Sequence, residues 1–566
     1  MKLKSTINNI ISSALQEASI NAPTQSVTNA TRKEFGDFQY NGAMSLAKSL
    51  GSNPREIATN VSKYIHSNAI EKVEIAGPGF INIWIDNNWL SSQLNDITKD
   101  KNLGISVNKK NEKIVVDYSG PNMAKEMHVG HLRSTIIGDT LSNLFGFLGY
   151  DVIRQNHIGD WGTQFGMLIA YLEEIQNEGK SYDELKDLEH FYKLAKAKFD
   201  SDASFANTAR EYVVKIQGGD SYCLGLWQKF IDTSLAHCEE VYDKLGVKLT
   251  KNDVRAESSY NDMLPQIVQE LETKGLITIS DGAKCIFLPN SEVPIIVQKS
   301  DGGYLYATTD LAALKYRSQI ISAKRICYVV DARQSEHFRQ VFWVSKEAGF
   351  VETDTSLEHI AFGTMMDRSG KPFKTRDGGT VKLIDLLDEA IVRAKDTISS
   401  KESLDNDVLE HTAKVIGIGA LKYADLSVNR ESNYIFDWDK MLSFDGNTAL
   451  YMQYAYARIQ SILRRFDGEL IGEINIQSDI EHKLGLALLE FEDILSKVYD
   501  DAMPNHLTGY LYELATLFMQ FYELSPILKD GIDHETKMSR LLLADLTAKT
   551  IKQGLSILGI EVVDKL

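Results

Sequence analysis

Two histidines, His128 and His131, stand at the point where an apolar run gives way to a helical pattern, and Gly130 lies between them. Helix N-termini attract phosphate, because backbone N–H groups there have no carbonyl partner and the helix dipole is positive. Histidines at that end can donate hydrogen bonds to a phosphoryl group whose negative charge is growing. A nucleotide can lie against the backbone at Gly130, which has no side chain. The pattern indicates chemistry on the phosphates of a nucleotide.

A βαβ unit is predicted to position these histidines. Residues 113–118 form a short, β-branched apolar run that ends at Ser119, as a buried strand and its exit turn do. Apolar residues then recur at helical spacing, and residues 151–154 resemble a second strand. Both histidines would therefore lie at the N-terminus of the first helix. Two ordinary histidines at a helix start are the alternative if the four residues are taken alone.

Longer stretches around the histidines point to one family. The sequence reads DYSGPNMAK at 117–125, HVGH at 128–131 and NHIGDWGTQFG at 156–166. These motifs resemble the arginyl-tRNA synthetase form of the class I aminoacyl-tRNA synthetase signature. The resemblance covers nearly the whole chain and is least diagnostic over 170–290. It implies an arginine-tRNA ligase, which makes arginyl-adenylate from L-arginine and ATP and transfers arginine to the terminal ribose of tRNA(Arg).

The resemblance also implies a site for the arginine side chain. A guanidinium presents a rigid fork of donors and stays charged at any working pH, so its site needs carboxylates. Asp117 ends the first predicted strand, and Asp310 shares a face with Tyr306 if that segment is helical. Gln334 follows the strand-like residues 326–330, at the edge where ligands bind in open α/β sheets. The arginine-binding residues implied by the family are Asp117, Ser119, Asn122, Tyr306, Asp310 and Gln334.

ATP is expected beside the histidines and the glycine-rich stretch 156–166. His128 and His131 are the predicted donors to the phosphates, whose charge the enzyme must stabilise while it orients the two substrates. Mg²⁺ is expected with ATP, bound through phosphates and water, because no fixed metal-ligand spacing is visible in the sequence. Further ATP-binding residues implied by the resemblance are Gly130, His157, Gly159, Asp160, Gly162 and Gln164.

The second class I signature, a loop whose lysines contact the pyrophosphate, is degenerate in this chain. Its counterpart is 367–379, where Asp377 stands near the place of a key lysine. In many bacterial arginyl enzymes a lysine just before the first signature is thought to compensate, and Lys125 occupies that place. We predict that Lys125 is a catalytic residue that neutralises ATP phosphate charge. A solvated turn residue is the alternative. The assisting residues of the loop would be Lys371, Lys374 and Arg376.

Segments near both ends of the chain resemble the RNA-binding modules of the family. In the N-terminal module, which contacts the tRNA elbow, Phe80 would stack on a base and Asn82 would read its edge. Tyr451, Tyr454 and Arg458 can share one helical face where the sequence is similar to the start of the anticodon-binding domain. Packing inside a small core, or against a neighbouring helix, remains the alternative for both sets.

Composition bounds the class of protein. The chain has 566 residues, enough for three or four domains, and its 43% hydrophobic and 25% charged residues describe an ordinary globular protein. A net charge of −17 gives no global attraction to nucleic acid, so RNA contacts must use local basic patches. The four cysteines lie far apart, which suits a reducing cytoplasm and argues against a cysteine zinc site.

No membrane partner is expected. The N-terminus has the pattern of an amphipathic helix rather than a signal peptide, and no apolar run is long enough to span a membrane. We therefore expect a cytoplasmic protein whose partners are tRNA(Arg), L-arginine and ATP. By resemblance to the family, we expect it to be a monomer.

The predicted fold is multidomain α/β: a Rossmann-type parallel-sheet catalytic domain with an insertion, a small α+β N-terminal domain, and an all-α C-terminal helical bundle. Helices are expected near 3–18 and 54–68, with strands at 80–85, 326–330 and 359–362. The predicted domains are 1–110 (tRNA-elbow-binding), 111–385 (catalytic, with a mostly helical insertion at about 170–290), 386–445 (linking helices) and 446–566 (α-helical, anticodon-binding).

Two rival functions come from other classes. A nucleotidylyltransferase would share the HVGH motif, but such enzymes are short and have no RNA-binding ends. A catalytically silent, tRNA-binding paralogue would keep both end modules and lose active-site residues. Asp117, Asn122, His128, His131 and Gln334 are all present, which argues against that paralogue.

Overall fold

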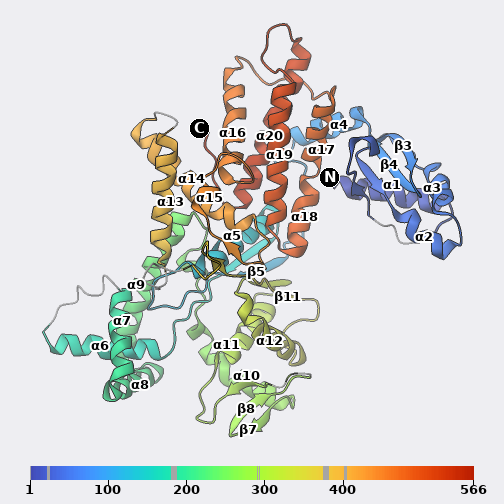
Figure 1. Ribbon diagram of the computed structural model, residues 1–566. Helices are drawn as coiled ribbons and strands as arrows, with labels where there is room; N and C mark the ends of the chain where they lie inside the picture. The colour runs from blue at the N-terminus through green and yellow to red at the C-terminus, as the bar shows by residue number, and fades with distance from the viewer. Residues whose placement is uncertain are drawn as a thin grey trace. The chain divides into compact units, whose positions relative to one another are not determined.

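The computed structural model describes residues 2–21, 26–179, 188–289, 291, 293–373, 381–400 and 404–566. The chain forms two compact units (Figure 1). Unit 1 contains both ends of the sequence, Met1–Val107, Ser443–Ser556 and Glu561–Leu566. Unit 2 contains Asn108–Leu442 and Ile557–Ile560. Within the described residues, no helix has the length and apolar character needed to cross a membrane.

Unit 2 is built on a four-stranded parallel sheet with the order β11-β10-β5-β6. Its strands are β5 (Lys113–Asp117), β6 (Asp151–Gln155), β10 (Arg325–Tyr328) and β11 (Ser356–His359). The inner strands β5 and β10 are almost wholly buried, as expected of a parallel sheet covered on both faces. The predicted strands at 113–118, 151–154 and 326–330 are confirmed. The strand predicted at 359–362 ends at His359, earlier than expected.

Helix α5 (Gly130–Phe147) connects β5 to β6 and carries the signature histidines at its start. It is buried on nearly all sides, between the sheet and α14 (Asn406–Leu426). Gly138 allows close packing, because a Cβ there would lie 2.2 Å from the ring of Tyr118. Arg133 forms a fully buried ion pair with Asp425 of α14 at 3.0 Å. This pair fixes the signature helix to the helices that follow the sheet.

The insertion between the two halves of the sheet is helical, with one small sheet that the sequence analysis missed. Its helices are α6 (Thr163–Asn177), α7 (Leu188–Ser201), α8 (Ala203–Gln217), α9 (Ser221–Leu245) and α10 (Leu264–Thr273). The three antiparallel strands are β7 (Thr278–Ser280), β8 (Ala283–Ile286) and β9 (Ile295–Gln298). They are short and half exposed, so they lack the apolar run that marks a buried strand.

The rest of unit 2 frames the carboxyl edge of the sheet. Helix α11 (Tyr306–Lys315) precedes β10, and α12 (Ser335–Glu347) connects β10 to β11. The short strands β12 (Met365–Met366) and β13 (Tyr434–Ile435) pair in parallel. The remaining helices are α13 (Leu383–Ser399) and α15 (Trp438–Met441). As predicted, helices dominate beyond residue 380.

Unit 1 joins the first and last segments of the chain. The sheet β1 (Thr28–Asn29), β2 (Phe38–Tyr40), β4 (Phe80–Ile85) and β3 (Ile70–Ala76) is antiparallel in that order. Its helices are α1 (Leu3–Glu17), α2 (Gly42–Leu50), α3 (Pro54–Ser62) and α4 (Asn87–Thr98). The C-terminal helices are α16 (Ala449–Arg465), α17 (Asp479–Leu489), α18 (Phe491–Asp501), α19 (Asn505–Leu524) and α20 (His534–Ile557).

One histidine connects these two segments. His482 of α17 contacts Asn87 Oδ1 at 2.6 Å and Asp37 Oδ1 at 3.1 Å. The strand at 80–85 is confirmed, whereas the helix predicted over 54–68 ends at Ser62. Ser67 and Asn68, which favour turns over helix interiors, follow that end.

Candidate active site

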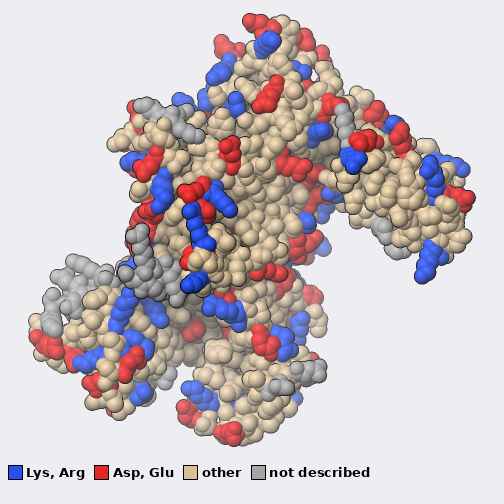
Figure 2. Space-filling view, viewed as in Figure 1, with Lys and Arg blue, Asp and Glu red and all other residues tan. Residues whose placement is uncertain are grey.

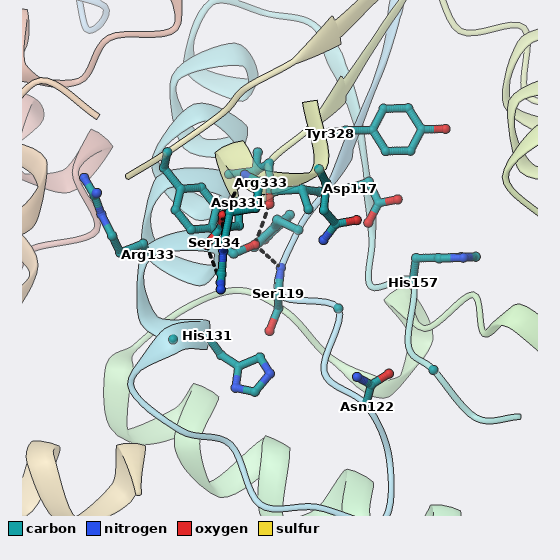
Figure 3. Close-up of a pocket in the computed structure, with 18 of the residues that line it drawn as sticks. Asp117, Ser119, Asn122, His131, Arg133, Ser134, His157, Tyr328, Asp331 and Arg333 are labelled. Atoms are coloured by element: carbon teal, nitrogen blue, oxygen red, sulfur yellow. Dashed lines mark hydrogen bonds and ion pairs between the residues drawn. The ribbon is translucent and has the colours of Figure 1, made fainter. Parts of the chain in front are cut away.

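A cavity of about 910 Å³ opens at the carboxyl ends of β5 and β10 in unit 2. This is where open α/β sheets bind ligands. Figure 3 shows His131 and Asn122 facing the space between the start of α5 and the loop that carries Asn122. Eleven predicted site residues line the cavity: Asp117, Ser119, Asn122, His128, Gly130, His131, His157, Gly159, Tyr306, Asp310 and Gln334.

The two signature histidines lie at the N-terminus of α5 with ring centroids 4.1 Å apart. His131 Nδ1 accepts the backbone N–H of His128 at 3.1 Å, and His128 Nδ1 accepts that of Gly130 at 3.0 Å. Burial, and then the neighbouring His128, lower the pKa of His131 to about 3, so its ring is neutral near neutral pH. The Nδ1 atom of His131 also lies 3.3 Å from His128 O, so the neutral ring can carry its proton on either nitrogen.

The Asn122 loop pairs with the glycine-rich stretch. Asn122 and Gly159 form a short parallel bridge, and the Met123 N–H donates to Gly159 O at 2.9 Å. A Cβ at position 159 would lie 2.2 Å from Asn122 Oδ1, so only glycine allows this approach. Ser119 is 6% exposed, and its hydroxyl contacts that of Tyr242 at 2.7 Å. The side chain of Ser119 thus already has a partner inside the protein.

Asp117 carries a partner that the sequence analysis did not predict. Its carboxylate lies 2.7 Å from the guanidinium of Arg317, a fully buried side chain that follows α11. The Arg317 Nε–H donates to Gln155 at 2.6 Å, and the guanidinium stacks over Tyr328 at 4.8 Å. The charge of Asp117 is therefore matched by the protein itself, and this carboxylate is less available to a substrate guanidinium than the sequence suggested.

Asp310 and Tyr306 share one face of α11, as predicted for a helical segment. Tyr306 is 65% exposed, and Asp310 is largely buried with its Oδ2 atom 2.6 Å from His337 Nε2. The rings of Tyr306 and His337 are 4.9 Å apart. His337 was missed, although it lies only three residues after Gln334 on the same segment.

Glu257 is a second site residue that the sequence analysis missed. It lines the cavity, and burial together with Asp310 and Asp160 raises its pKa to about 7. Within the described residues it makes no ion pair, unlike Asp117 and Asp310. No sequence signal marked it, because it lies in a 3-10 turn between the insertion helices α9 and α10 and its position depends on the fold.

Lys125 lies outside the lining of the cavity, on the exposed side of the signature loop. Its ammonium lies over the ring of Tyr192 of α7, 4.7 Å from the centroid. The preceding residue, Ala124, has φ +72 and donates its N–H to Ser234 of α9 at 3.0 Å. Two insertion helices thus contact the segment that carries Lys125.

Four further predicted ATP residues also lie outside the lining. Asp160 accepts from Ser258, and burial raises the pKa of Asp160. Gln164 donates to Trp161 O at 2.9 Å beside Gly162, whose φ is +123. Lys371 closes a turn in which its N–H donates to Asp367. The roles of these residues stay predictions. Lys374 and Arg376 lie outside the described residues.

The predicted RNA-contacting residues lie in unit 1. Asn82 is 1% exposed and accepts from Gln39 at 2.8 Å, and its contact with RNA stays a prediction. Phe80 is half-buried at the start of β4.

The residues predicted to share a face of α16 pack against α19. Tyr451 lies 5.6 Å from the ring of Tyr512, and the Arg458 guanidinium lies 4.6 Å from that of Tyr522. Tyr454 is half-buried beside them. The packing alternative therefore describes most of this face of α16.

On the side of the molecule that Figure 2 shows, positively and negatively charged side chains are mixed across the surface.

Family models match the chain over most of its length. Residues 93–438 match the catalytic domain of class I tRNA synthetases (R). The chain belongs to the arginyl-tRNA synthetase family. Residues 3–85 match the arginyl-tRNA synthetase N-terminal domain, and residues 452–566 match the DALR anticodon-binding domain. The exact domain bounds proposed from the sequence remain a prediction.

Similar proteins cover the chain from end to end. An arginine-tRNA ligase of Cellvibrio japonicus is 51% identical, and the match covers 100% of both chains. An arginine-tRNA ligase of Shewanella sp. (strain ANA-3) is 52% identical, and the match covers 100% of this chain and 99% of the relative. The arginyl-tRNA synthetase structure from Plasmodium falciparum superposes with a TM-score of 0.89 at 32% identity over 100% of both chains. The Thermus thermophilus arginyl-tRNA synthetase, at 22% identity over 100% of both chains, shares the fold with a TM-score of 0.84.

Proposed function

We propose that this chain is an arginine-tRNA ligase that activates L-arginine with ATP and transfers it to tRNA(Arg). The observation that carries the proposal is the cavity itself, where the signature histidines and the Asp310 carboxylate line one space. A phosphate site and a guanidinium site thus open into the same cavity. The family match over 93–438 supports the same activity.

In the first step, a carboxylate oxygen of arginine attacks the α-phosphorus of ATP. The bond to the bridging oxygen of the β-phosphate breaks, and pyrophosphate leaves with the bonding electrons. His131 donates a ring N–H to a phosphate oxygen as charge spreads in this step, and it does so as a neutral ring. The terminal ribose hydroxyl of the tRNA then attacks the arginyl carbonyl, and AMP leaves.

The guanidinium end of the substrate meets Asp310, Tyr306 and Glu257. Because Arg317 matches the charge of Asp117, we assign Asp117 mainly to shaping the pocket. The pKa of Glu257 is raised by burial and by other carboxylates, so a bound cation would stabilise its ionised form. Among competing amino acids, lysine has no planar guanidinium and citrulline has no positive charge. Either one would leave buried carboxylates without a well-matched partner.

Several finer features belong to the same proposal. Mg²⁺ would arrive with ATP and be held through phosphates and water. Lys125 would leave the Tyr192 ring and neutralise phosphate charge. The four cysteines are free and buried, which supports a cytoplasmic location. We keep the monomer as the proposed assembly.

The transfer step provides the test. Radiolabelled arginine is expected to become attached to total bacterial tRNA when the protein and Mg-ATP are present. Periodate oxidation of the terminal ribose diol should abolish the attachment, because no hydroxyl remains to attack the adenylate. A protein that forms no arginyl-tRNA from intact tRNA would contradict the proposed function.

A further inference from the structure

His337 contacts two of the three side chains that the proposed function assigns to the substrate guanidinium, Asp310 and Tyr306. It lies on α12 and faces α11, and its Nε2 atom is 2.6 Å from Asp310 Oδ2. Its ring is 4.9 Å from that of Tyr306. The His337 and Asp310 side chains are 15% and 14% exposed. One imidazole therefore bridges two residues that are one helical turn apart.

The imidazole is itself held in place by an aromatic cluster. Its ring centroid is 5.3 Å from that of Phe338, which also contacts Tyr328 at 4.8 Å and His359 at 4.9 Å. Tyr328 stacks on Arg317, the partner of Asp117. A donor with this support can fix a carboxylate rotamer before a ligand arrives.

The hydrogen bond has a defined direction. A carboxylate accepts, so His337 Nε2 carries the proton and donates to Oδ2 of Asp310. The bond occupies one carboxylate oxygen and leaves Oδ1 for a ligand. A substrate guanidinium would then meet a carboxylate of fixed orientation beside the phenol of Tyr306.

We propose that His337 is a positioning residue for arginine recognition, which acts by holding Asp310 and Tyr306 in the geometry that receives the guanidinium. This inference rests on the proposed function. His337 acts on binding of the amino acid and has no part in ATP binding.

Two substitutions separate the hydrogen bond from the ring contact. His337→Phe keeps an aromatic ring beside Tyr306 and removes the donor, and His337→Gln places an amide N–H near the position of Nε2. In arginine-dependent ATP–pyrophosphate exchange with tRNA present, H337F is expected to raise the KM for arginine by about tenfold or more. The KM for ATP should change less than about twofold, and H337Q should recover much of the loss.

His359→Phe is the matched control. It removes a histidine from the other side of Phe338, where His359 bonds Val330 O at 3.0 Å and does not line the cavity. Its KM for arginine is expected to stay near the wild-type value. Asp310→Asn should raise the KM for arginine, and adding H337F to it should cost little more, because His337 acts through Asp310.

The outcomes separate the two proposals. A wild-type protein without arginine-dependent exchange would overturn the proposed function. With an active wild type, an H337F variant whose KM for arginine is unchanged, or whose KM values rise equally for arginine and ATP, would overturn the role of His337 alone. An unchanged KM in D310N would remove Asp310 from the arginine site and the role of His337 with it.

Discussion

Four carboxylates line the cavity. Three of them contact an arginine or histidine side chain of the protein. Arg317 pairs with Asp117, and Arg333 pairs with Asp331 at 2.8 Å. His337 holds Asp310, whereas Glu257 has no such partner within the described residues. A cationic substrate therefore gains most from the Asp310 and Glu257 region, because elsewhere its charge would compete with an existing ion pair.

Glu257 should make stability depend on pH. Its pKa is raised from 4.5 to about 7 in the folded protein, so folding favours the protonated form. The stability that this preference supplies is fully present below the unfolded pKa and is lost as pH rises through about 7. Glu257→Gln is therefore expected to be more stabilising at about pH 8 than at about pH 5, by on the order of 2 kcal/mol. Urea unfolding at both pH values checks this, and a pH-independent difference would contradict it.

Lys125 provides a prediction for the ATP side of the site. Lys125→Ala is expected to lower the rate of arginine-dependent pyrophosphate exchange about 10- to 100-fold, because one charge-stabilising contact to the phosphates is lost. Lys125→Arg should keep much of the activity. Tyr192 lies under the ammonium, so near-normal exchange in K125A would leave Lys125 as a solvated residue that rests on this ring.

At the scale of elements, the βαβ unit was predictable because its patterns are local. The β-branched run of β5 and the helical spacing after it mark their elements directly. The pairing of Asp117 with Arg317 was not predictable, since 200 residues of sequence separate the two and only the sheet brings them together. The short strands β7–β9 lacked a clear apolar pattern.

Two glycines of α5 test how tightly this helix is packed. Gly138→Ala is expected to destabilise the protein by about 1–3 kcal/mol, because its Cβ would overlap the ring of Tyr118 at 2.2 Å. Gly146→Ala is the control on the same helix, where an added Cβ meets no atom within 4 Å. It should stabilise by about 0.5–1 kcal/mol, since alanine favours the helix. Equal effects of the two substitutions in urea unfolding would refute this packing.

At the scale of the whole molecule, the resemblance predicted the order of the domains along the chain. It did not predict that the N-terminal and C-terminal segments would form one unit. The sequence suggested a separate N-terminal module and a separate helical C-terminal one. The structure places both in unit 1, with His482 joined to Asp37 and Asn87. A histidine that connects residues about 400 positions apart leaves no local pattern to read.

The acidic balance of the whole chain bears on RNA binding. A net charge of −17 gives no general attraction to a polyanion, so any tRNA contact must come from local surfaces. The two predicted sets of contact residues are largely engaged within unit 1, Asn82 in the sheet and Arg458 against α19. Their contact with RNA stays a prediction.

ATP–pyrophosphate exchange shows whether this cavity activates arginine. Each of the twenty amino acids would be assayed with and without total tRNA. The cavity, which is lined by Asp310, Glu257 and His131, predicts exchange with arginine alone. Exchange driven by another amino acid, or none under any condition, would contradict the account.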